Sequence, residues 1–463
     1  MPPLQVLNPW NRTLVAEIPF TGEKEIENIF ERAFALSKNI NQQLTKIKRI
    51  EILENLVRLM NGLRDDLITT ALKEGGKPYT DTKVEVDRAI QGVKIAIREI
   101  HTLAGTEIPM GITPSSANRL AFTLLEPIGV VLAYSAFNHP LNLIVHQVVP
   151  AIATGCPVII KPAPVTPVSC LNFVKMLADA GLPEGWCQPI ICDNATAEKM
   201  VSDTRINYFN FIGSAKIGWH LHSLLAPGVR CTLEHGGAAP VIVCEDANLT
   251  DMLPLITKGG YYHAGQVCVS VQRVFVPENL LEQIANEISS LAGKMKVGDP
   301  AEESTAIGPL IRIDEMARLE EWVKEAEMSG GNVVTGGKRF SDTSFLPTLI
   351  VNPSQKAKVS THEIFGPVIC LYSYKNIDEA ISVANNLSFN FQSAVFTSNL
   401  DKAFYCIQRL KGSAIMVNDS TTFRADWMPF GGHGYSGIGT GGIPHTMKEM
   451  SKEKLVVWRS AWV

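Results

Sequence analysis

Long apolar runs and an excess of charge of one sign are both missing from this sequence of 463 residues. The most apolar stretches, at 128–137 and 148–160, are shorter than the roughly 18 residues that a membrane span needs. The 42 basic and 46 acidic residues give a formal net charge of −4, which is too small to favour nucleic acid or an anionic membrane surface as a partner. We therefore expect a protein that binds a small molecule, and neither nucleic acid nor a membrane.

Cysteine pairs are missing as well. Nine cysteines are spread over the chain without a Cys-x-x-Cys motif, and the first residues lack the basic start and apolar segment of a signal peptide. Disulfide frameworks are typical of small secreted chains and not of a chain of this length. We therefore expect a cytoplasmic protein with reduced thiols that are available for chemistry, and we expect no metal site.

Strand-like and helix-like segments alternate over most of the chain. Residues 22–103 are predicted to be mainly helical, because apolar residues recur there at helical spacing, and residues 120–134 are predicted as strand. Short apolar runs then predict buried strands at 128–134, 157–160, 207–212 and 240–243, with helices between them at 141–154, 167–180 and 216–225. A second alternation after residue 234 is expected to form its own layer. This order predicts an α/β fold with a mostly parallel sheet.

One cysteine has neighbours that suit a nucleophile. Cys268 lies in the segment GQVCVS (265–270), where a glycine-containing polar stretch meets a β-prone one. Reactive thiols are often found at such junctions, and a thiolate is a strong nucleophile once its pKa is lowered. Taken alone, however, each of the nine cysteines is more often a small buried apolar residue.

Two glycine-containing segments could place further polar groups. In TLEHGG (232–237), Glu234 precedes paired glycines, and burial could raise the pKa of its carboxyl group far enough for it to act as a base on water. In FIGSAKIG (211–218), glycines follow a predicted strand and open a helix, so that backbone N–H groups could meet a phosphate. Each signal is weak alone, because Glu234 could be a solvated turn residue and the glycine spacing is not the dinucleotide-binding GxGxxG.

Six ordered segments make these features specific. They are EPIGVVLAYSAFNHPLNLIVHQVVPAIATGCPVIIKPA (126–163), FIGSAKIG, LEHGG, GQVC, EIFGPV (363–368) and PFGG (429–432). Their order and spacing over nearly the whole chain, including the separation of Glu234 and Cys268, resemble the aldehyde dehydrogenase superfamily. The resemblance implies an NAD(P)+-dependent enzyme that oxidises an aldehyde to a carboxylic acid.

The resemblance implies a catalytic role for three matching residues. Cys268 would be the nucleophile that adds to the aldehyde carbonyl and later carries a thioester. Asn138, in AFNHP, would form the oxyanion hole together with the backbone N–H of Cys268, where donors stabilise the charge that develops on oxygen. Glu234 would activate the water that hydrolyses the thioester.

The resemblance also implies a site for NAD or NADP. The residues that would contact the cofactor are Lys161 at the adenosine ribose, Gly213, Ser214 and Gly218 under the pyrophosphate, and Glu363 with Phe365 at the nicotinamide ribose. Pro164 stands where many NAD-preferring relatives carry a glutamate. Because a carboxylate there would repel a 2′-phosphate, its absence leaves NADP admissible beside NAD.

The substrate is indicated by two further segments. FNHPLN (137–142) and NDSTTFRAD (418–426) are similar to the branch of the family that acts on small polar or anionic aldehydes, such as lactaldehyde, glyceraldehyde 3-phosphate and phosphonoacetaldehyde. Arg424 is a candidate anion anchor, because a guanidinium binds carboxylate or phosphonate groups through paired hydrogen bonds. His139 is a second candidate for substrate contact. A network of Arg424 with Asp426 that only fixes the loop is an equal alternative.

The implied architecture is α/β and aldehyde dehydrogenase-like, in three parts. They are a Rossmann-like NAD(P)-binding domain of residues 1–106 and 127–235, an α/β catalytic domain of residues 236–445, and a bridging β element of residues 107–126 and 446–463. The last strand is rich in Val and Trp and would extend the sheet of a partner subunit. We therefore expect a homodimer or a homotetramer.

Three other interpretations stay open. A CoA-acylating aldehyde dehydrogenase would pass the acyl group to CoA, although the presence of Glu234 favours hydrolysis by water. A catalytically silent protein of the same fold would have no need of Cys268 or Glu234. A cofactor-independent Cys–His hydrolase could use His263 or His235, but it would have no use for EIFGPV. We expect His235 to have a structural role.

Overall fold

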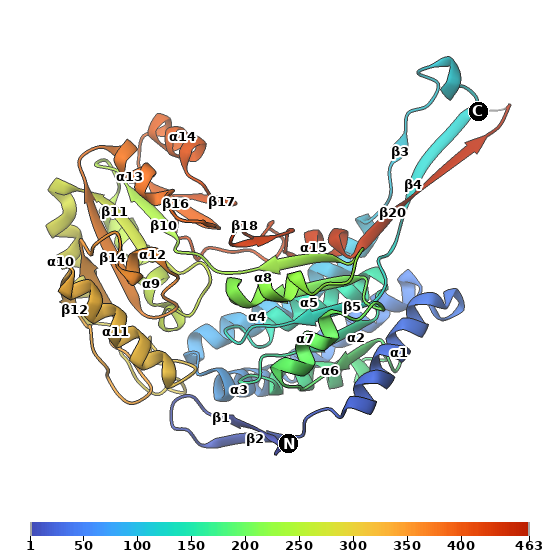
Figure 1. Cartoon of the computed structure of the whole chain (residues 1–463), viewed down its shortest axis with the longest axis horizontal. Coiled ribbons are helices and arrows are strands. Elements are labelled where there is room, and N and C mark those ends of the chain that lie inside the picture. The colour runs from blue at the N-terminus through green and yellow to red at the C-terminus, as the bar shows by residue number, and fades with distance from the viewer. Residues whose placement is uncertain (1, 462–463) are drawn as a thin grey trace.

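The computed structural model describes residues 2–461. The chain forms three larger sheets and two small two-stranded sheets. The first of the two-stranded sheets consists of β1 (Leu4–Leu7) and β2 (Leu14–Ile18). Two of the larger sheets lie in the body of the molecule, and the third projects from it as a long arm (Figure 1). No helix within residues 2–461 is both long enough and apolar enough to pass through a lipid bilayer.

The first large sheet has six strands in the order β19-β9-β8-β5-β6-β7. Its strands are β5 (Val131–Tyr134), β6 (Val158–Lys161), β7 (Cys187–Pro189), β8 (Tyr208–Ile212), β9 (Arg230–Glu234) and β19 (Gly437–Ile438). All neighbours pair in parallel except β19, which runs antiparallel to β9. The central strands are continuous apolar runs, as expected for parallel strands that are buried on both faces.

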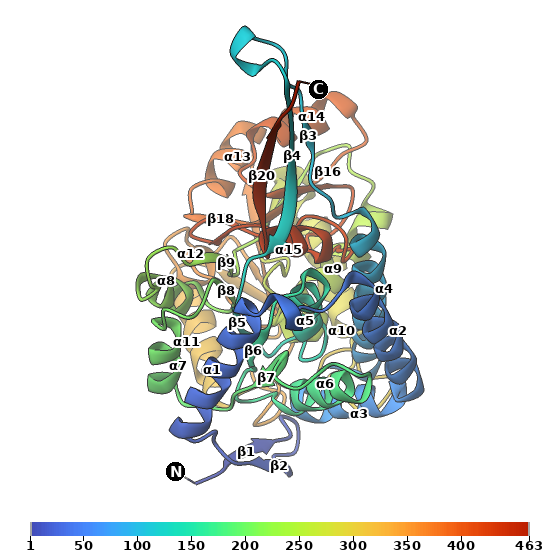
Figure 2. The same ribbon diagram turned by 90° about the vertical axis from the view of Figure 1, so that its right-hand side faces the viewer.

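Helices cover both faces of this sheet (Figure 2). They are α1 (Glu23–Lys38), α2 (Lys46–Gly62), α3 (Arg64–Gly75), α4 (Tyr79–Thr102), α5 (Asn142–Thr154), α6 (Val168–Asp179), α7 (Asn194–Val201), α8 (Ala215–Ser223) and α15 (Ile443–Glu449). Alternate strand residues point to opposite faces, so that Val131 packs in one core with α2, α4 and α5, whereas Leu132 packs in another with α1 and α7.

The second large sheet has seven strands in the order β12-β13-β14-β11-β10-β16-β17, and all pairs except β12 with β13 are parallel. Its strands are β10 (Pro240–Val243), β11 (Arg273–Pro277), β12 (Asn332–Thr335), β13 (Thr348–Val351), β14 (Val368–Tyr374), β16 (Gln392–Phe396) and β17 (Ala414–Val417). Its helices are α9 (Leu249–Tyr261), α10 (Leu281–Gly293), α11 (Asp314–Met328), α12 (Lys358–Thr361), α13 (Ile377–Ala384) and α14 (Leu400–Arg409).

The remaining elements are short. The 3-10 turns are η1 (Ile40–Gln42), η2 (Pro114–Ser116), η3 (Tyr262–Gly265) and η4 (Glu278–Leu280). The second two-stranded sheet pairs β15 (Phe389–Asn390) with β18 (His433–Gly434).

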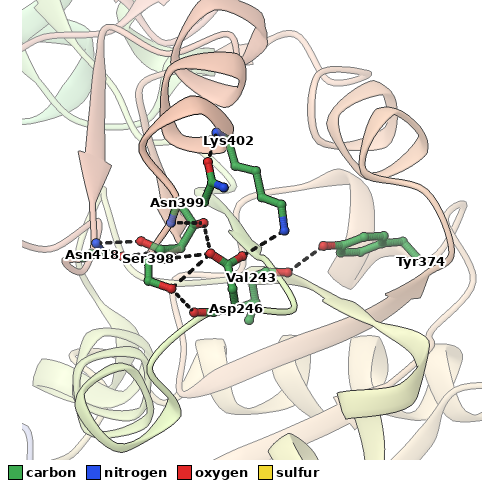
Figure 3. A network of polar contacts seen from close by, with 8 residues as sticks. Val243, Asp246, Tyr374, Ser398, Asn399, Lys402 and Asn418 are labelled. Carbon is green, nitrogen blue, oxygen red and sulfur yellow. Dashed lines mark hydrogen bonds and ion pairs between the residues drawn. The ribbon is translucent and has the colours of Figure 1, made fainter.

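A polar network joins the segment after β10 to the start of α14 (Figure 3). The carboxylate of Asp246 accepts hydrogen bonds from Thr397 Oγ1 (2.8 Å) and from the backbone N–H of Ser398 (3.0 Å). It also accepts one from Lys402 Nζ (3.1 Å). Burial opposes ionisation of Asp246, but the donors outweigh this effect and hold the pKa of the carboxyl group well below its usual range. The network therefore fastens α14 to the sheet.

The third sheet forms the arm. It consists of β3 (Glu107–Ile108), β4 (Arg119–Pro127) and β20 (Ser451–Arg459), in the order β20-β4-β3. β20 pairs antiparallel with β4 from Ser451↔Pro127 to Arg459↔Arg119. Apolar side chains stay exposed on the arm, among them Leu455 (60%) and Trp458 (63%). Residues 462–463 of the last predicted strand lie outside the described residues.

The structure confirms the α/β fold with mostly parallel sheets and corrects one predicted strand. Residues 120–134 form not one strand but two, because β4 lies in the arm and β5 in the six-stranded sheet. The break includes Gly129, which has a φ of +127°. An added Cβ at Gly129 would lie 2.1 Å from Asn207 Oδ1, which accepts a hydrogen bond from the Val130 N–H (2.9 Å). The division into three domains stays a prediction; β19, from the range 236–445, belongs to the six-stranded sheet.

Candidate active site

A cavity of about 1620 Å³ is lined by strand ends of the six-stranded sheet and by helices and loops from both halves of the chain. Pockets for one small molecule usually measure about 300–1000 Å³, so this cavity has room for a dinucleotide together with a substrate. The predicted site residues that line it are Asn138, His139, Lys161, Gly213, Ser214, Glu234, Cys268, Glu363, Phe365 and Arg424. Gly218 is not among them and lies against the ring of His235.

A tight left-handed turn holds Cys268. His263 and Ala264 have φ values of +48° and +54°, and Gly265 follows with +70°. Such a run of left-handed residues costs free energy unless the surroundings enforce it. Here the side chain of Gln266 braces the turn, because its Nε2 donates to the carbonyls of His263 (3.1 Å) and Pro309 (3.2 Å). The thiol is only partly buried and reaches the cavity.

The amide of Asn138 lies beside this turn. Asn138 Nδ2 donates to the carbonyl oxygen of Gln266 at 3.0 Å, two residues before the nucleophile candidate. A primary amide has two N–H donors, so the second one remains for a ligand oxygen. The structure therefore brings the predicted oxyanion donor and the predicted nucleophile to one wall of the cavity.

A buried ion pair supports the segment that carries Asn138. Glu85 Oε1 accepts hydrogen bonds from the backbone N–H groups of Leu141 (3.0 Å) and Asn142 (3.1 Å), at the start of α5. Its other oxygen is bound to Lys77 Nζ, and both side chains are at most 1% exposed. Sequence analysis did not identify either residue, because the groups that Glu85 binds lie 56 and 57 positions away and leave no local pattern.

Two ionisable groups that face the cavity are perturbed by burial. Glu234 ends β9, and burial raises the pKa of its carboxyl group to about 7, while the cation of Arg424 opposes this rise. Burial also raises the pKa of the Cys268 thiol well above its usual value, and the charge of Glu234 adds to that effect. The thiol is therefore protonated at neutral pH in this state, and it needs a base for its activation. Glu234 has a pKa near the pH at which a general base works best.

Glu363 and Phe365 also line the cavity, with Glu363 beside Gly236. Burial raises the pKa of Glu363 to about 8, and its Oε1 has no hydrogen-bond partner among residues 2–461. An added Cβ at Gly236 would lie 1.6 Å from Glu363 Oε1, so the glycine makes room for this carboxyl group. Phe365 has a φ of +49° and packs edge-to-face on Phe137, with ring centroids 5.8 Å apart. The unsatisfied oxygen indicates a ligand donor at this position.

The other end of the cavity suits a phosphate-containing ligand. Ser214 is the N-cap residue of α8, and the backbone N–H of Gly213 donates to the Glu234 carbonyl (3.1 Å). Lys161 ends β6, and its Nζ lies 5.5 Å from the ring centroid of Tyr134. Pro164 presents no carboxylate on this part of the wall. A helix N-terminus and a lysine favour an anionic group.

The side chain of His235 is held by one hydrogen bond and by ring packing, and its structural role stays a prediction. Its Nδ1 lies 3.0 Å from the Gly213 carbonyl oxygen, which requires the proton on Nδ1. The ring packs edge-to-face on Phe211 and on Trp219, with both centroid distances at 5.7 Å. An added Cβ at Gly218 would lie 1.9 Å from His235 Cε1, which explains why a glycine stands there.

Arg424 and Asp426 belong to one cluster but are not bonded to each other. Asp426 accepts two hydrogen bonds from Arg88 (2.6 and 3.1 Å) and lies 2.8 Å from His146 Nε2. Arg424 approaches only the other ring nitrogen of His146, at 3.4 Å, and its guanidinium lies 3.5 Å from the centroid of the Phe430 ring. Arg424 Nε has no partner among residues 2–461. The loop is thus fixed by Asp426 through Arg88, a residue that the sequence did not single out.

Known proteins resemble this chain over almost its whole length. The family described as "Aldehyde dehydrogenase family" matches residues 2–456. A 3-sulfolactaldehyde dehydrogenase from Priestia megaterium is 35% identical over 456 residues, which cover 98% of this chain and 94% of the relative. A lactaldehyde dehydrogenase from Methanocaldococcus jannaschii is 32% identical over 459 residues, covering 98% and 97%.

Solved structures of aldehyde dehydrogenases have the same fold as this chain. Aldehyde dehydrogenase 21 from Physcomitrella patens, in complex with the reaction product succinate, superposes with a TM-score of 0.95 at 33% identity, over 99% of this chain and 95% of that one. A glyceraldehyde-3-phosphate dehydrogenase from Methanocaldococcus jannaschii, complexed with NADP, gives a TM-score of 0.94 at 31% identity, over 99% and 100%.

Proposed function

Because the chain belongs to the aldehyde dehydrogenase family, it is an oxidoreductase of aldehydes that uses NAD(P), and we propose that it forms a carboxylate through a thioester on Cys268. The observation that carries this proposal is that one cavity collects the thiol, the amide of Asn138 and the carboxyl group of Glu234. A nucleophile, an oxyanion donor and a base near neutral pKa are the groups that acyl chemistry requires.

The residues divide the reaction among them. Glu234 takes the thiol proton, and the Cys268 sulfur forms a bond to the aldehyde carbon while the carbonyl π electrons move to oxygen. The free N–H of the Asn138 amide and the backbone N–H of Cys268 stabilise that oxygen. When bound, NAD(P)+ would supply the acceptor for the hydride that leaves the aldehyde carbon as the C=O bond re-forms. Glu234 releases the thiol proton to solvent, and it can then deprotonate a water that attacks the thioester. The C–S bond breaks as the carboxylic acid forms, and the Cys268 thiolate regains a proton from Glu234.

The cavity fits the cofactor at three places. Gly213 and Ser214 would lie under the pyrophosphate, and Lys161 would reach the adenosine ribose. Glu363 would accept hydrogen bonds from the nicotinamide ribose hydroxyls, which would satisfy its unpartnered oxygen, with Phe365 beside it. Both NAD and NADP are compatible with Pro164, because it carries no charge that would repel a 2′-phosphate.

The substrate is proposed to carry an anionic group as well as the aldehyde. The charge of Asp426 is taken up by Arg88, while Arg424 has no carboxylate within ion-pair distance among residues 2–461. A half-buried guanidinium that lines a cavity without a carboxylate partner can bind a carboxylate, sulfonate or phosphate through charge-assisted hydrogen bonds. The names of the relatives, 3-sulfolactaldehyde and lactaldehyde dehydrogenase, fit a small aldehyde of this kind.

The arm is proposed to join two copies of the chain. β20 is an edge strand with exposed apolar residues, including Leu455, Val457 and Trp458. Long apolar edge strands invite pairing with another sheet. A homodimer or a dimer of dimers would cover them, and light scattering that gives the mass of a single chain would contradict this part of the proposal.

The reaction is tested with a panel of aldehydes, each mixed with NAD+ and NADP+ in turn. We expect reduced nicotinamide to form with at least one anionic aldehyde. Cys268→Ala should lower kcat by about 1000-fold or more, because the variant has no nucleophile for the covalent pathway. Cys231→Ser is the matched control, since this cysteine does not line the cavity.

A second test separates hydrolysis from acyl transfer to CoA. Glu234→Gln replaces the carboxyl group by its neutral amide isostere and so removes the base for both the thiol and the water. We expect turnover to stop without a burst of reduced nicotinamide. Product analysis of the wild-type enzyme with and without CoA completes the test. Free carboxylate in both cases supports hydrolysis, whereas an acyl-CoA product that requires CoA would contradict it.

A further inference from the structure

Two polar side chains lie beside each other on the wall of the cavity, near the reactive groups. His139 Nε2 lies 3.4 Å from Tyr262 Oη, and the two ring centroids are 6.2 Å apart with planes tilted by 33°. Both residues line the cavity. His139 directly follows Asn138 in the chain, and Tyr262 opens the turn that carries Cys268. The pair therefore lies close to the groups that would hold the aldehyde carbon and oxygen.

The hydrogen-bonding capacity of the pair is largely unused. Hydrogen bonds that involve a hydroxyl group usually measure about 2.5–3.0 Å, so the contact of 3.4 Å is long and weak. Within residues 2–461, neither side chain makes another hydrogen bond with the protein. Polar groups on a cavity wall that have hydrogen-bonding capacity to spare favour a ligand group beside them.

The charge state of the pair matches a neutral polar group of a ligand. Burial lowers the pKa of His139 well below its usual value, and the cations of Lys77, Arg88 and Arg424 and the ring of His263 act in the same direction. Burial raises the pKa of the Tyr262 phenol, so it keeps its proton. The neutral imidazole offers one donor and one acceptor, and the phenol offers a donor and an acceptor. A hydroxyl group, which donates one hydrogen bond and accepts others, is the matching partner.

We propose that His139 and Tyr262 bind a hydroxyl group on the carbon next to the aldehyde, so that the enzyme selects 2-hydroxyaldehydes. The argument for this carbon is positional. Asn138 and the Cys268 N–H would hold the carbonyl oxygen. His139 and Tyr262 line the same cavity, and Tyr262 opens the turn that carries Cys268, so the pair lies on the side of a group close to the carbonyl carbon. Arg424 is then left for a more distant anionic group. This inference rests on the proposed oxidation of an aldehyde at Cys268.

The test compares two substrates that differ only in this hydroxyl group. The ratio of kcat/KM for lactaldehyde to that for propanal is measured in the wild-type enzyme, and we expect at least 10, because a site built to bind a hydroxyl group leaves its polar groups unpaired with the analogue. Tyr262→Phe should lower this ratio at least fivefold, mainly because kcat/KM for lactaldehyde falls while kcat/KM for propanal changes little. His139→Leu should do the same, while His139→Gln, which keeps a neutral donor and acceptor, should recover part of the ratio.

The matched control is the neighbouring tyrosine. Tyr261 Oη donates to the carbonyl of Thr348 (3.0 Å) and does not line the cavity, so Tyr261→Phe should leave the ratio unchanged. A wild-type ratio near 1 would overturn the inference, and so would an equal loss with both aldehydes in Tyr262→Phe, which would indicate a merely structural role. Failure of the enzyme to oxidise any aldehyde is a different result: it would refute the proposed function, and this inference with it.

Discussion

Asp246 and Asp426 each collect several hydrogen-bond donors, but the two clusters differ in where their donors come from. The donors to Asp246 all lie in one stretch, 397–402, at the start of a single helix (Figure 3). The main donors to Asp426 come from two helices of the other half of the chain, 338 positions away at Arg88 and 280 at His146. The first cluster fastens one element to its own sheet, whereas the second holds the C-terminal loop against α4 and α5.

The clusters also differ in how their charges balance. Asp246 is matched by Lys402, one acid to one base. Asp426 is matched by Arg88, and its cluster contains a second cation, Arg424, that faces the cavity without an anion of its own. A polar cluster whose charges cancel can be purely structural and needs no ligand. A cluster with a buried excess charge calls for a ligand of the opposite sign.

The largest effect should come from removing each carboxylate in turn. Asp426→Asn leaves Arg88 and Arg424 near each other in a buried place, so we expect the free energy of unfolding to fall by about 3–5 kcal/mol. Asp246→Asn changes a cluster near the surface and should cost about 1 kcal/mol. Urea unfolding followed by circular dichroism measures the free energy of unfolding of both variants. Equal losses of this free energy in the two variants would contradict the distinction between the clusters.

The same variants predict a dependence on pH. Both carboxyl groups have a pKa below the usual range in the fold, so their stabilisation is complete above the unfolded value of about 3.9 and is lost as the pH falls through the folded value. The difference in unfolding free energy between the wild-type protein and Asp426→Asn should therefore shrink as the pH is lowered from 6 towards 3. A difference that stays constant over this interval would contradict the assignment.

An intermediate effect is expected from removing the two cations. Arg424→Gln should lower kcat/KM by about 10- to 100-fold for an aldehyde with an anionic group and far less for a neutral aldehyde of the same length, since a charge-assisted hydrogen bond is worth about 1.5–3 kcal/mol. Lys402→Gln should leave kcat/KM for both aldehydes as in the wild-type enzyme. A similar loss with both aldehydes in Arg424→Gln would show that Arg424 supports the loop without binding the substrate.

The smallest effect concerns the pH profile. Because the pKa of Glu234 is raised to about 7 by burial, kcat for a neutral aldehyde should increase with pH through that region, as the base loses its proton. The cation of Arg424 lowers this pKa, so Arg424→Gln should move the rise to higher pH, while Lys402→Gln should not move it. If kcat rises at the same pH in all three proteins, Arg424 does not affect the pKa of Glu234.

Sequence reasoning succeeded where a feature is local. Apolar runs predicted β5, β6, β8 and β10 to within a few residues, because a buried parallel strand must be continuously apolar. It failed at 120–134, where the chain stays β-prone although it passes from one sheet to another. The composition of this segment does not reveal the break. The break becomes visible in the structure, where Gly129 lies against Asn207.

The sequence by itself determined the family, the α/β fold and, with the exception of Gly218, the predicted site residues that line the cavity, because the ordered motifs place these side chains at fixed spacings. Only the tertiary structure decided what those side chains are bonded to. It joins Asp426 to Arg88 and leaves Arg424 without a carboxylate at ion-pair distance among residues 2–461. Burial and, less strongly, nearby cations lower the pKa of His139, so that its ring stays neutral, and Glu85 lies under the start of α5. Charge balance and desolvation depend on neighbours from distant parts of the chain, and these neighbours exist only after folding.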